Sequence, residues 1–403
     1  MRRPAGDRAA DQHDAPSKRL RVAVFLLGDE SFGIETFVLN ELAHAGAYGI
    51  DFEYVCLEQG AIYESLCKAG ATVTLIGGRM PHQDLKFGLQ HLWIWLRRPN
   101  CFRTAYREVL EYLQFRRPDA ACSHAYYTHV LCGLVKSRVH CPMIGQFHKI
   151  HRTGPLLGLQ RALACALYAW AFDRVFTVSA ASRDSMWGPV RHKTSVIHSG
   201  VDIESIRRSA EGVTKQRGRL VLVGRIDVLK KQDLAIRAVR LLADEHIECV
   251  LDLVGGPPAE SDPYYLRLRS LVGELGLEDR VVFSGVLSPP YRRIASSEIL
   301  VNCSTQEAFG LVIVEAMACG TPVVAAEGGG PGELLVDGQT GLYFEPGNPA
   351  ALAAALKRLL ADANLRSRLA KGAYEDAKQR FDMSTHMKEL RKQLLRCCFK
   401  GGH

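Results

Sequence analysis

Short apolar runs alternate with longer amphipathic segments along nearly the whole chain. The runs are rich in β-branched and aromatic residues, and most are separated by segments whose apolar residues recur with helical spacing. Apolar strands that alternate with helices are typical of parallel sheets covered on both faces. The predicted strands of the first half are 21–28, 51–57, 72–78, 119–124, 143–148, 174–179 and 195–200, and those of the second half are 219–224, 249–255, 280–285, 299–304, 321–327 and 341–346.

A polar stretch with few large apolar side chains, residues 202–218, separates the two series of strands. We interpret it as a linker between an N-terminal domain (20–201) and a C-terminal domain (219–381). The predicted fold is therefore α/β, with two doubly wound, Rossmann-like domains facing a cleft, and ligands of such sheets bind at the carboxyl ends of the strands. A last helical pattern, within residues 382–403, could pack back on the N-terminal domain.

Composition narrows the class of protein. The 403 residues are too many for one ordinary core, and 47% hydrophobic with 23% charged residues is typical of a soluble globular protein. The net charge of +8 suits an anionic small ligand or membrane surface, but the chain lacks the dense basic stripe of a nucleic-acid-binding protein. Residues 1–19 lack the apolar core of a secretory signal and predict a disordered tail.

The cysteines and the apolar runs bear on the cellular compartment in which we expect the protein. None of the twelve cysteines belongs to a group with zinc-ligand spacing, and most lie in apolar runs, as buried reduced thiols do. No uncharged apolar run is long enough to span a bilayer. We expect a cytoplasmic protein, with peripheral membrane contact as a further possibility.

Two cations follow the first strand of the second half. Arg225 comes directly after the strand that ends at Gly224, and Lys230 stands just before the next helical pattern. A helix N-terminus offers free N–H groups and partial positive charge, so this junction is suited to a phosphate. The alternative is a pair of solvated surface cations.

A single acid interrupts an apolar helix. From Ala308 to Cys319 every residue is apolar or Gly except Glu315. An unpaired buried carboxylate costs several kcal/mol, so Glu315 needs either an interior Arg or Lys or a polar ligand. Glu307 lies in the loop before the predicted helix, and helix rise puts Glu315 about 8 Å from the start of that helix, so the two acids could hold two ends of one ligand.

These segments together resemble a known family. GRIDVLKKQD, the spacing of Glu307 and Glu315 with Phe-Gly after the first Glu, GTPVV, a Gly-rich turn and TGLYF follow one another over about residues 222–350. This combination resembles the donor-binding half of glycosyltransferase family 4, retaining enzymes of the GT-B fold. The first half is similar in its strand–helix rhythm and in two segments, SFGIETFVLNELA (31–43) and GQFHKIH (145–151).

The resemblance implies roles for the basic residues and for one glycine. Arg225 and Lys230 would bind the donor diphosphate, and Gly33 would let the first-domain loop approach the donor phosphate. Lys231 stands where the family often has Gly, so Lys230 and Lys231 could exchange roles.

The two acids and the amides between them would bind the rest of the donor. By the resemblance, Glu307 would hydrogen-bond the transferred sugar and Glu315 the ribose. The backbone amides that would hold the distal phosphate and the sugar are those of Phe309, Gly310 and Leu311.

The family also places a histidine near the reacting sugar. His148, at the end of a predicted strand, matches that position. We therefore expect His148 and Glu307 to form the catalytic set. His151 is a nearby competitor, and a structural strand-end histidine is the alternative for His148.

The resemblance predicts a retaining hexosyltransferase that needs no metal or other cofactor, since no D-x-D motif occurs in the chain. The donor would be a nucleotide sugar, UDP- or GDP-linked, and the acceptor a hydroxyl of a glycan, a lipid-linked molecule or a small molecule. The alternative is a non-catalytic nucleotide-sugar-binding subunit of a glycosylation complex. An NAD-dependent dehydrogenase is disfavoured because G-x-G-x-x-G follows neither first strand.

Residues 84–118 mix aromatic and arginine side chains, a combination found at anionic bilayer surfaces. We expect this region to contact either a membrane or a lipid-linked acceptor. The alternative is two ordinary helices with core aromatics and solvated arginines. The residues concerned are Trp93, Trp95, Phe102, Tyr106, Arg97, Arg98, Arg103, Arg107, Arg116 and Arg117.

Overall fold

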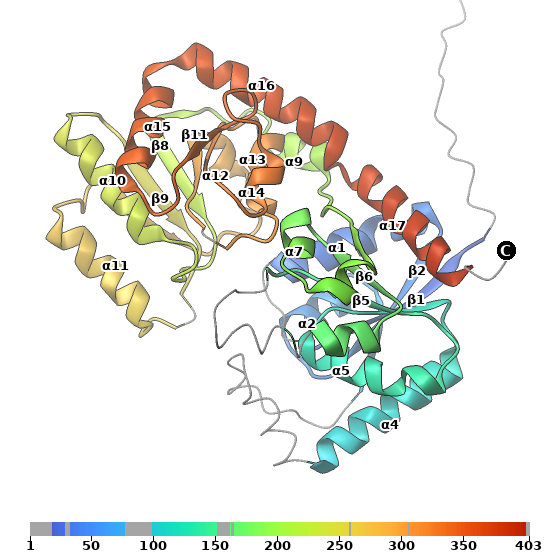
Figure 1. The fold of residues 1–403 in the computed structure, drawn as a ribbon. Coiled ribbons are helices and arrows are strands. Elements are labelled where there is room, and N and C mark those ends of the chain that lie inside the picture. Colours follow the sequence, from blue (N-terminus) through green and yellow to red (C-terminus); the bar gives the residue numbers. More distant parts are fainter. Residues whose placement is uncertain are drawn as a thin grey trace, which may run out of the picture.

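The computed structural model describes residues 18–28, 33–76, 99–150, 162, 165–257, 259–304 and 306–399. Within these residues the chain forms two parallel sheets with helices packed around each (Figure 1). Two buried apolar clusters belong mainly to the first sheet and two mainly to the second, as expected for strands whose side chains alternate between two covered faces. The predicted fold class, two doubly wound α/β domains, is confirmed.

The N-terminal sheet has the strand order β3-β2-β1-β4-β5-β6-β7. Its order reverses between β1 and β4, and the carboxyl ends of strands beside such a switch point are where ligands bind. The strands are β1 Leu20–Leu26, β2 Ile50–Cys56, β3 Thr72–Leu75, β4 Ala120–Ser123, β5 Met143–Phe147, β6 Arg174–Thr177 and β7 Thr194–Val196. The helices are α1 Gly33–Ala45, η1 Gly46–Tyr48, α2 Ala61–Lys68, α4 Pro99–Arg116, α5 Tyr126–Val135, η2 Lys136–Arg138, α7 Ala180–Asp184 and α8 Gly188–Arg191.

The C-terminal sheet has the order β10-β9-β8-β11-β12-β13, with its switch point between β8 and β11. The strands are β8 Gln216–Val223, β9 Val250–Val254, β10 Val281–Gly285, β11 Ser297–Asn302, β12 Val323–Ala326 and β13 Leu342–Phe344. The helices are α9 Ile203–Ser209, α10 Gln232–Asp244, α11 Pro263–Glu274, α12 Tyr291–Ser296, α13 Leu311–Ala318, α14 Pro331–Leu334, α15 Pro349–Ala361, α16 Ala363–Arg380 and α17 Met383–Cys398. The predicted phosphate-binding and acidic residues follow β8 and β11, the two strands at this switch point.

The predicted linker, residues 202–218, is more structured than its composition suggested. It contains α9 and the first residues of β8. Ile203 and Ile206 of α9 are buried in an apolar cluster of the C-terminal domain. Two apolar side chains one turn apart are enough to dock a short helix, so the segment packs as part of that domain despite its polarity.

The C-terminal helix crosses back to the N-terminal domain (Figure 1). Four apolar side chains of α17 are buried in a cluster of that domain, and each contributes about 1.5–3 kcal/mol through burial: Met383, Met387, Leu390 and Leu394. The outward and return crossings are bonded to each other, because Val201 N–H donates to the Phe381 carbonyl (3.0 Å) and Met383 N–H to the Val201 carbonyl (2.9 Å). The two segments that connect the domains, at Val201 and at Phe381–Met383, therefore run side by side and are hydrogen-bonded to each other.

Candidate active site

The junction between β8 and α10 brings the predicted phosphate-binding residues to a strand end. A Cβ on Gly255, at the end of β9, would lie 2.0 Å from the Gly224 carbonyl oxygen, so the two strand ends approach as closely as only a glycine permits. The Lys230 side chain lies across Gly224, since a Cβ on that glycine would be 3.6 Å from Lys230 Cε. Sequence spacing alone could not give this position for the lysine.

The two predicted cations differ in what they contact. Lys230 Nζ donates to Glu307 Oε2 at 2.6 Å, and this ion pair joins the β8–α10 and β11–α13 junctions. Arg225 is about half exposed and pairs with Asp227 at 3.0 Å. Lys231 has a left-handed backbone (φ 55°) at the N-cap of α10, which accounts for glycine being common at this position in the family. Lys230, not Lys231, is the lysine that reaches the second junction.

The loop before α13 packs tightly against the Gly-rich turn at 328–330. Gly330 N–H donates to the Glu307 carbonyl at 2.8 Å. A Cβ on Gly330 would lie 2.4 Å from the Phe309 carbonyl oxygen, so a larger residue would push the two loops apart. The Phe309 ring is buried and stacks on His198, with centroids 5.8 Å apart. The Gly-rich turn thus packs against the backbone of the Glu307–Gly310 loop and holds that loop in place.

The N-terminus of α13 has free donors. Gly310, with φ 105°, is the N-cap, and no side chain caps the helix. Among the described residues, none accepts a hydrogen bond from the predicted anion-binding amides, which are those of Phe309, Gly310 and Leu311. Free amides at a helix N-terminus attract negative charge, so this geometry can hold an anion.

Glu315 is the fifth residue of α13 and is 8% exposed. Burial raises the pKa of its carboxyl group to about 7. In the part of the chain that the structure describes, no cation or hydrogen-bond donor pairs with this carboxylate. The interior salt bridge offered above as the alternative is therefore not formed among these residues, which leaves the carboxylate available to a polar ligand.

His148 directly follows β5 and lies against a second histidine. Its Nε2 is 3.1 Å from Nδ1 of His124, which follows β4, and the two rings are stacked with centroids 5.2 Å apart. Phe37 of α1 packs its ring at 4.9 Å from that of His148. Burial, with a smaller contribution from Lys149, lowers the pKa of His148 to about 3, and burial lowers the pKa of His124 as well. Both imidazoles are neutral at neutral pH, so one nitrogen of the pair donates and the other accepts.

Gly33 is the first residue of α1, one turn before Phe37, and no described atom lies within 4 Å of the position its Cβ would take. Its predicted approach to the donor phosphate stays a prediction. His151 lies outside the described residues. Ile150, two residues after His148, packs on the C-terminal core beside Gly329, at 3.6 Å from the position of a Cβ there. The His148 loop and the Gly-rich turn therefore meet between the domains.

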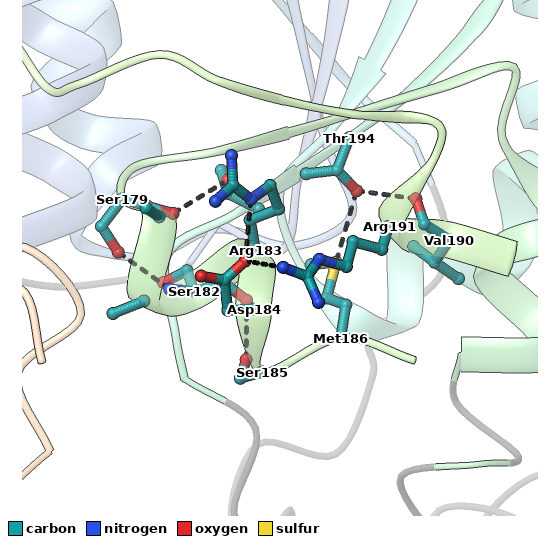
Figure 2. A network of polar contacts seen from close by, with 12 residues as sticks. Ser179, Ser182, Arg183, Asp184, Ser185, Met186, Val190, Arg191 and Thr194 are labelled. Carbon is teal, nitrogen blue, oxygen red and sulfur yellow. Dashed lines mark hydrogen bonds and ion pairs between the residues drawn. The ribbon is translucent and has the colours of Figure 1, made fainter. Parts of the chain in front are cut away.

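Sequence reasoning missed a second contact between the domains. The Glu333 carboxylate, on α14, accepts hydrogen bonds from the Ala180 and Ala181 amides at 2.8 and 2.7 Å and lies 3.3 Å from His198 Nε2. The helix that supplies these amides, α7, is itself held by a polar network (Figure 2). In it Ser179 caps the helix at Ser182 N–H, and Asp184 pairs with Arg183 and Arg191.

The sequence contained a signal for one of the two residues that were missed, His124, but none for Glu333. His124 ends a predicted strand, as His148 does, and the strand-end criterion used for His148 would have found it. Glu333 follows the glycine run, but nothing in the spacing indicated that it would reach the other domain. It could only be found from the structure.

The region predicted to touch a membrane is only partly described, because Trp93, Trp95, Arg97 and Arg98 lie outside the described residues. Phe102 and Tyr106 of α4 pack against the N-terminal core. Arg116 pairs with Glu53 at 2.8 Å. These three side chains match the alternative of an ordinary helix on the sheet. None of the described helices is both long and apolar enough to cross a membrane.

Family models match both halves of the chain. The model described as Glycosyltransferase Family 4 matches residues 33–205, and the model described as Glycosyl transferases group 1 matches residues 204–376. Two similar curated proteins are D-inositol 3-phosphate glycosyltransferases. That of Streptomyces bingchenggensis is 36% identical over 230 residues, covering 52% of this chain and 50% of the relative, and that of Acidothermus cellulolyticus is 34% identical over 224 residues, covering 51% and 50%. The chain thus spans about half the length of these curated relatives.

Solved structures share the whole fold. HepE of Anabaena, crystallised with UDP and glucose, superposes with a TM-score of 0.76 at 22% identity, covering 93% of this chain and 99% of HepE. Sucrose-phosphate synthase of Thermosynechococcus elongatus superposes with a TM-score of 0.75 at 20% identity, covering 95% and 100%. At these identities the likeness concerns the arrangement of the two domains.

Proposed function

This chain belongs to glycosyltransferase family 4, and from that premise we propose that it transfers a sugar from a nucleoside-diphosphate sugar to a hydroxyl acceptor. One observation carries the proposal. At the β11–α13 junction the carboxylates of Glu307 and Glu315 flank amides that have no acceptor among the described residues, and Lys230 lies 2.6 Å from the first acid. A cation and free amides suit a diphosphate, and the two acids suit the hydroxyl groups on either side of it.

The Lys230–Glu307 ion pair has a direct role in this proposal. A bound diphosphate would compete with Glu307 for the Lys230 ammonium group. Glu307 would then be free to accept a hydrogen bond from the transferred sugar. Donor binding would in this way direct Lys230 to the diphosphate and Glu307 to the sugar. Arg225, which is more exposed, would be the second cation of the phosphate site. A buried carboxylate whose pKa is raised to about 7, as at Glu315, is stabilised when ribose hydroxyl groups donate to it.

The chemistry follows from where charge develops. As the bond from the sugar to the leaving diphosphate lengthens, Lys230, Arg225 and the α13 amides stabilise the negative charge on the departing oxygens without requiring a divalent metal. The acceptor hydroxyl attacks from the same face and gives its proton to the leaving phosphate, so the anomeric configuration is retained. Neutral His148 orients the sugar, and contact between the domains excludes water from the oxocarbenium-like sugar.

Donor and acceptor are proposed as classes. UDP is the first nucleotide to test because the structural neighbour from Anabaena was crystallised with it, and GDP is the second. The curated relatives are named for an inositol phosphate, so phosphorylated polyols lead the acceptor series, followed by glycans and lipid-linked sugars.

A thermal-shift screen with UDP, GDP, ADP and their glucose and mannose conjugates tests the donor site, since a ligand that binds only the folded state raises Tm. The best donor is then incubated with each acceptor class, with and without EDTA, and the product's anomeric proton is followed by NMR. We expect a retained linkage and activity in EDTA. A Tm unchanged by every nucleotide contradicts the donor site. Binding without transfer or hydrolysis favours the non-catalytic subunit.

A further inference from the structure

A cavity of about 560 Å³ lies at the opposite edge of the N-terminal sheet from the candidate active site. Its walls come from the residues that lead into β5, β6 and β7 and from the last turn of α17. We call it the basal pocket, and its charged lining consists of Lys136, Asp173, Arg174, Lys193 and Arg396. Because the candidate active site is at the carboxyl ends of the strands and this pocket is at their amino ends, the two are separate.

The basal pocket has more positive charge than its own carboxylate can neutralise. Lys136 Nζ pairs with Asp173 at 2.7 Å, which uses the one acidic group of the lining. Lys193 Nζ donates to the carbonyls of Ala169 and Phe172, at 2.7 and 3.2 Å, and so has hydrogen bonds but no counter-charge. Three cations of the lining therefore lack a carboxylate partner within the pocket.

Arg174 is the most informative of these cations. It is the first residue of β6 and is half-buried, yet no described residue accepts a hydrogen bond from its guanidinium group or pairs with it. Across the pocket, Arg396 of α17 is exposed; it interacts electrostatically with Glu389 of the same helix, but no described carboxylate lies within ion-pair distance of it. A guanidinium group held at a wall without a partner favours an anion that can accept two parallel hydrogen bonds.

We propose that the basal pocket binds a phosphate group carried by a small organic molecule. The volume is in the range of small-molecule sites and is larger than one phosphate needs, and Val139 and Pro142 supply an apolar wall for the rest of the ligand. A dianionic phosphate would neutralise most of the excess charge. Since Arg174 belongs to the sheet and Arg396 to α17, the bound phosphate would also fasten the C-terminal helix to the N-terminal domain.

Calorimetry with inorganic pyrophosphate tests the pocket, provided that the proposed donor site is removed first. Titrations are made into a variant that carries both Arg225→Ala and Lys230→Ala. We expect this variant to keep one pyrophosphate site, and we expect Arg174→Gln or Arg396→Gln, added to it, to weaken that site at least tenfold. Arg208→Gln, which removes an exposed arginine of α9, is the control for net charge and should leave the affinity unchanged.

Two results would overturn the proposal: no pyrophosphate binding in the donor-site variant, or binding that neither pocket substitution weakens. Circular dichroism and Tm of each variant establish that it is folded, and Arg396→Gln, at an exposed helix end, is the substitution least disruptive to folding. Flotation with phosphatidylcholine vesicles, with and without phosphatidate, separates the two sources of the phosphate. Binding to phosphatidate vesicles that is lost in Arg174→Gln indicates a lipid headgroup, and pyrophosphate binding without flotation indicates a soluble molecule.

Discussion

The two sides of the candidate active site are built from opposite kinds of group. On the C-terminal side, Lys230 and Glu307 are charged, partly exposed and 2.6 Å apart. On the N-terminal side, His148 and His124 are stacked in a desolvated environment in which the pKa of each is lowered, so both are neutral. One side can neutralise charge on a ligand, and the other can only orient it through hydrogen bonds.

From this difference we expect the two sides to respond differently to substitution. Charged groups aimed at developing charge contribute several kcal/mol to a transition state, whereas a positioning hydrogen bond contributes less. The C-terminal side should therefore dominate rate and donor affinity. The N-terminal side should affect rate modestly, without changing donor affinity.

Lys230→Ala is expected to have the largest effect, a loss of about 10²- to 10³-fold in kcat, or roughly 3–4 kcal/mol of transition-state stabilisation. Transfer rates at saturating donor measure it. Lys231→Ala is the matched control, because it removes the neighbouring ammonium group and leaves the ion pair to Glu307 intact. Equal losses in the two variants would contradict the assignment of the phosphate site to Lys230.

Glu315→Gln should have the next largest effect, and it should change both nucleotide affinity and the stability of the ligand-free protein. If Glu315 accepts hydrogen bonds from ribose, the neutral amide should weaken nucleotide binding by about 10- to 100-fold, since hydrogen bonds to charged groups contribute about 1.5–3 kcal/mol. Calorimetry with the nucleoside diphosphate measures this. Unchanged affinity would remove Glu315 from the donor site.

The same substitution should stabilise the ligand-free protein at high pH. The pKa of Glu315 is raised from 4.5 to about 7, so the folded state binds the proton more tightly than the unfolded state does. Protonation of Glu315 therefore contributes its full stability to the folded state below pH 4.5, and this stability is lost as pH rises to 7. Above pH 7 the buried charge costs roughly 3 kcal/mol. Glu315→Gln should therefore unfold at higher denaturant concentration than the wild type at pH 8, and the difference should disappear below pH 4.5.

The candidate residues of the C-terminal side could be picked out from the sequence because each stands out within its own short segment, although only the fold joins Lys230 to Glu307, 77 residues away. A lone acid in an apolar helix and a cation after a strand are both visible in the sequence, as Glu315 and Lys230 show. The N-terminal side depends on contacts between strands. His124 and His148 are 24 residues apart, and only the β4–β5 pairing brings them to 3.1 Å. The two amides that donate to Glu333 are 153 and 152 residues away and in the other domain.

His124→Phe should have a smaller effect, a loss of about tenfold in kcat with donor KM unchanged. The ring would keep the packing against Phe37 but would remove the hydrogen bond that fixes His148. His192→Ala, at an exposed histidine, is the control. A rise in donor KM instead would place His124 in donor binding and would weaken the contrast between the two sides.

Glu333→Gln tests whether the contact between Glu333 and the α7 amides holds the two sides in position, and it should cause the smallest change in activity. Burial alone would raise the pKa of Glu333, but hydrogen bonds from His198 and from the Ala180 and Ala181 amides lower it. A lowered acid pKa gives stability that is present above the ordinary value of 4.5 and is lost as pH falls through the folded value. Gln can still accept one of the two amide hydrogen bonds, so we expect a loss of about 1–2 kcal/mol at pH 7 that shrinks below pH 4.

Denaturant unfolding of Glu333→Gln at both pH values measures that loss, with Glu327→Gln as the control because Glu327 is an exposed acid at the start of the same turn. The contact is made across the domain boundary, so its loss should also lower kcat by a few-fold when donor and acceptor must be held together, while nucleotide affinity, which we expect to depend mainly on the C-terminal side, should stay the same. If nucleotide affinity fell as well, the charged and the neutral sides would be coupled through the Gly-rich turn, which contacts the Glu307 loop and leads into the helix that carries Glu333, and they could not be treated as independent halves of one site.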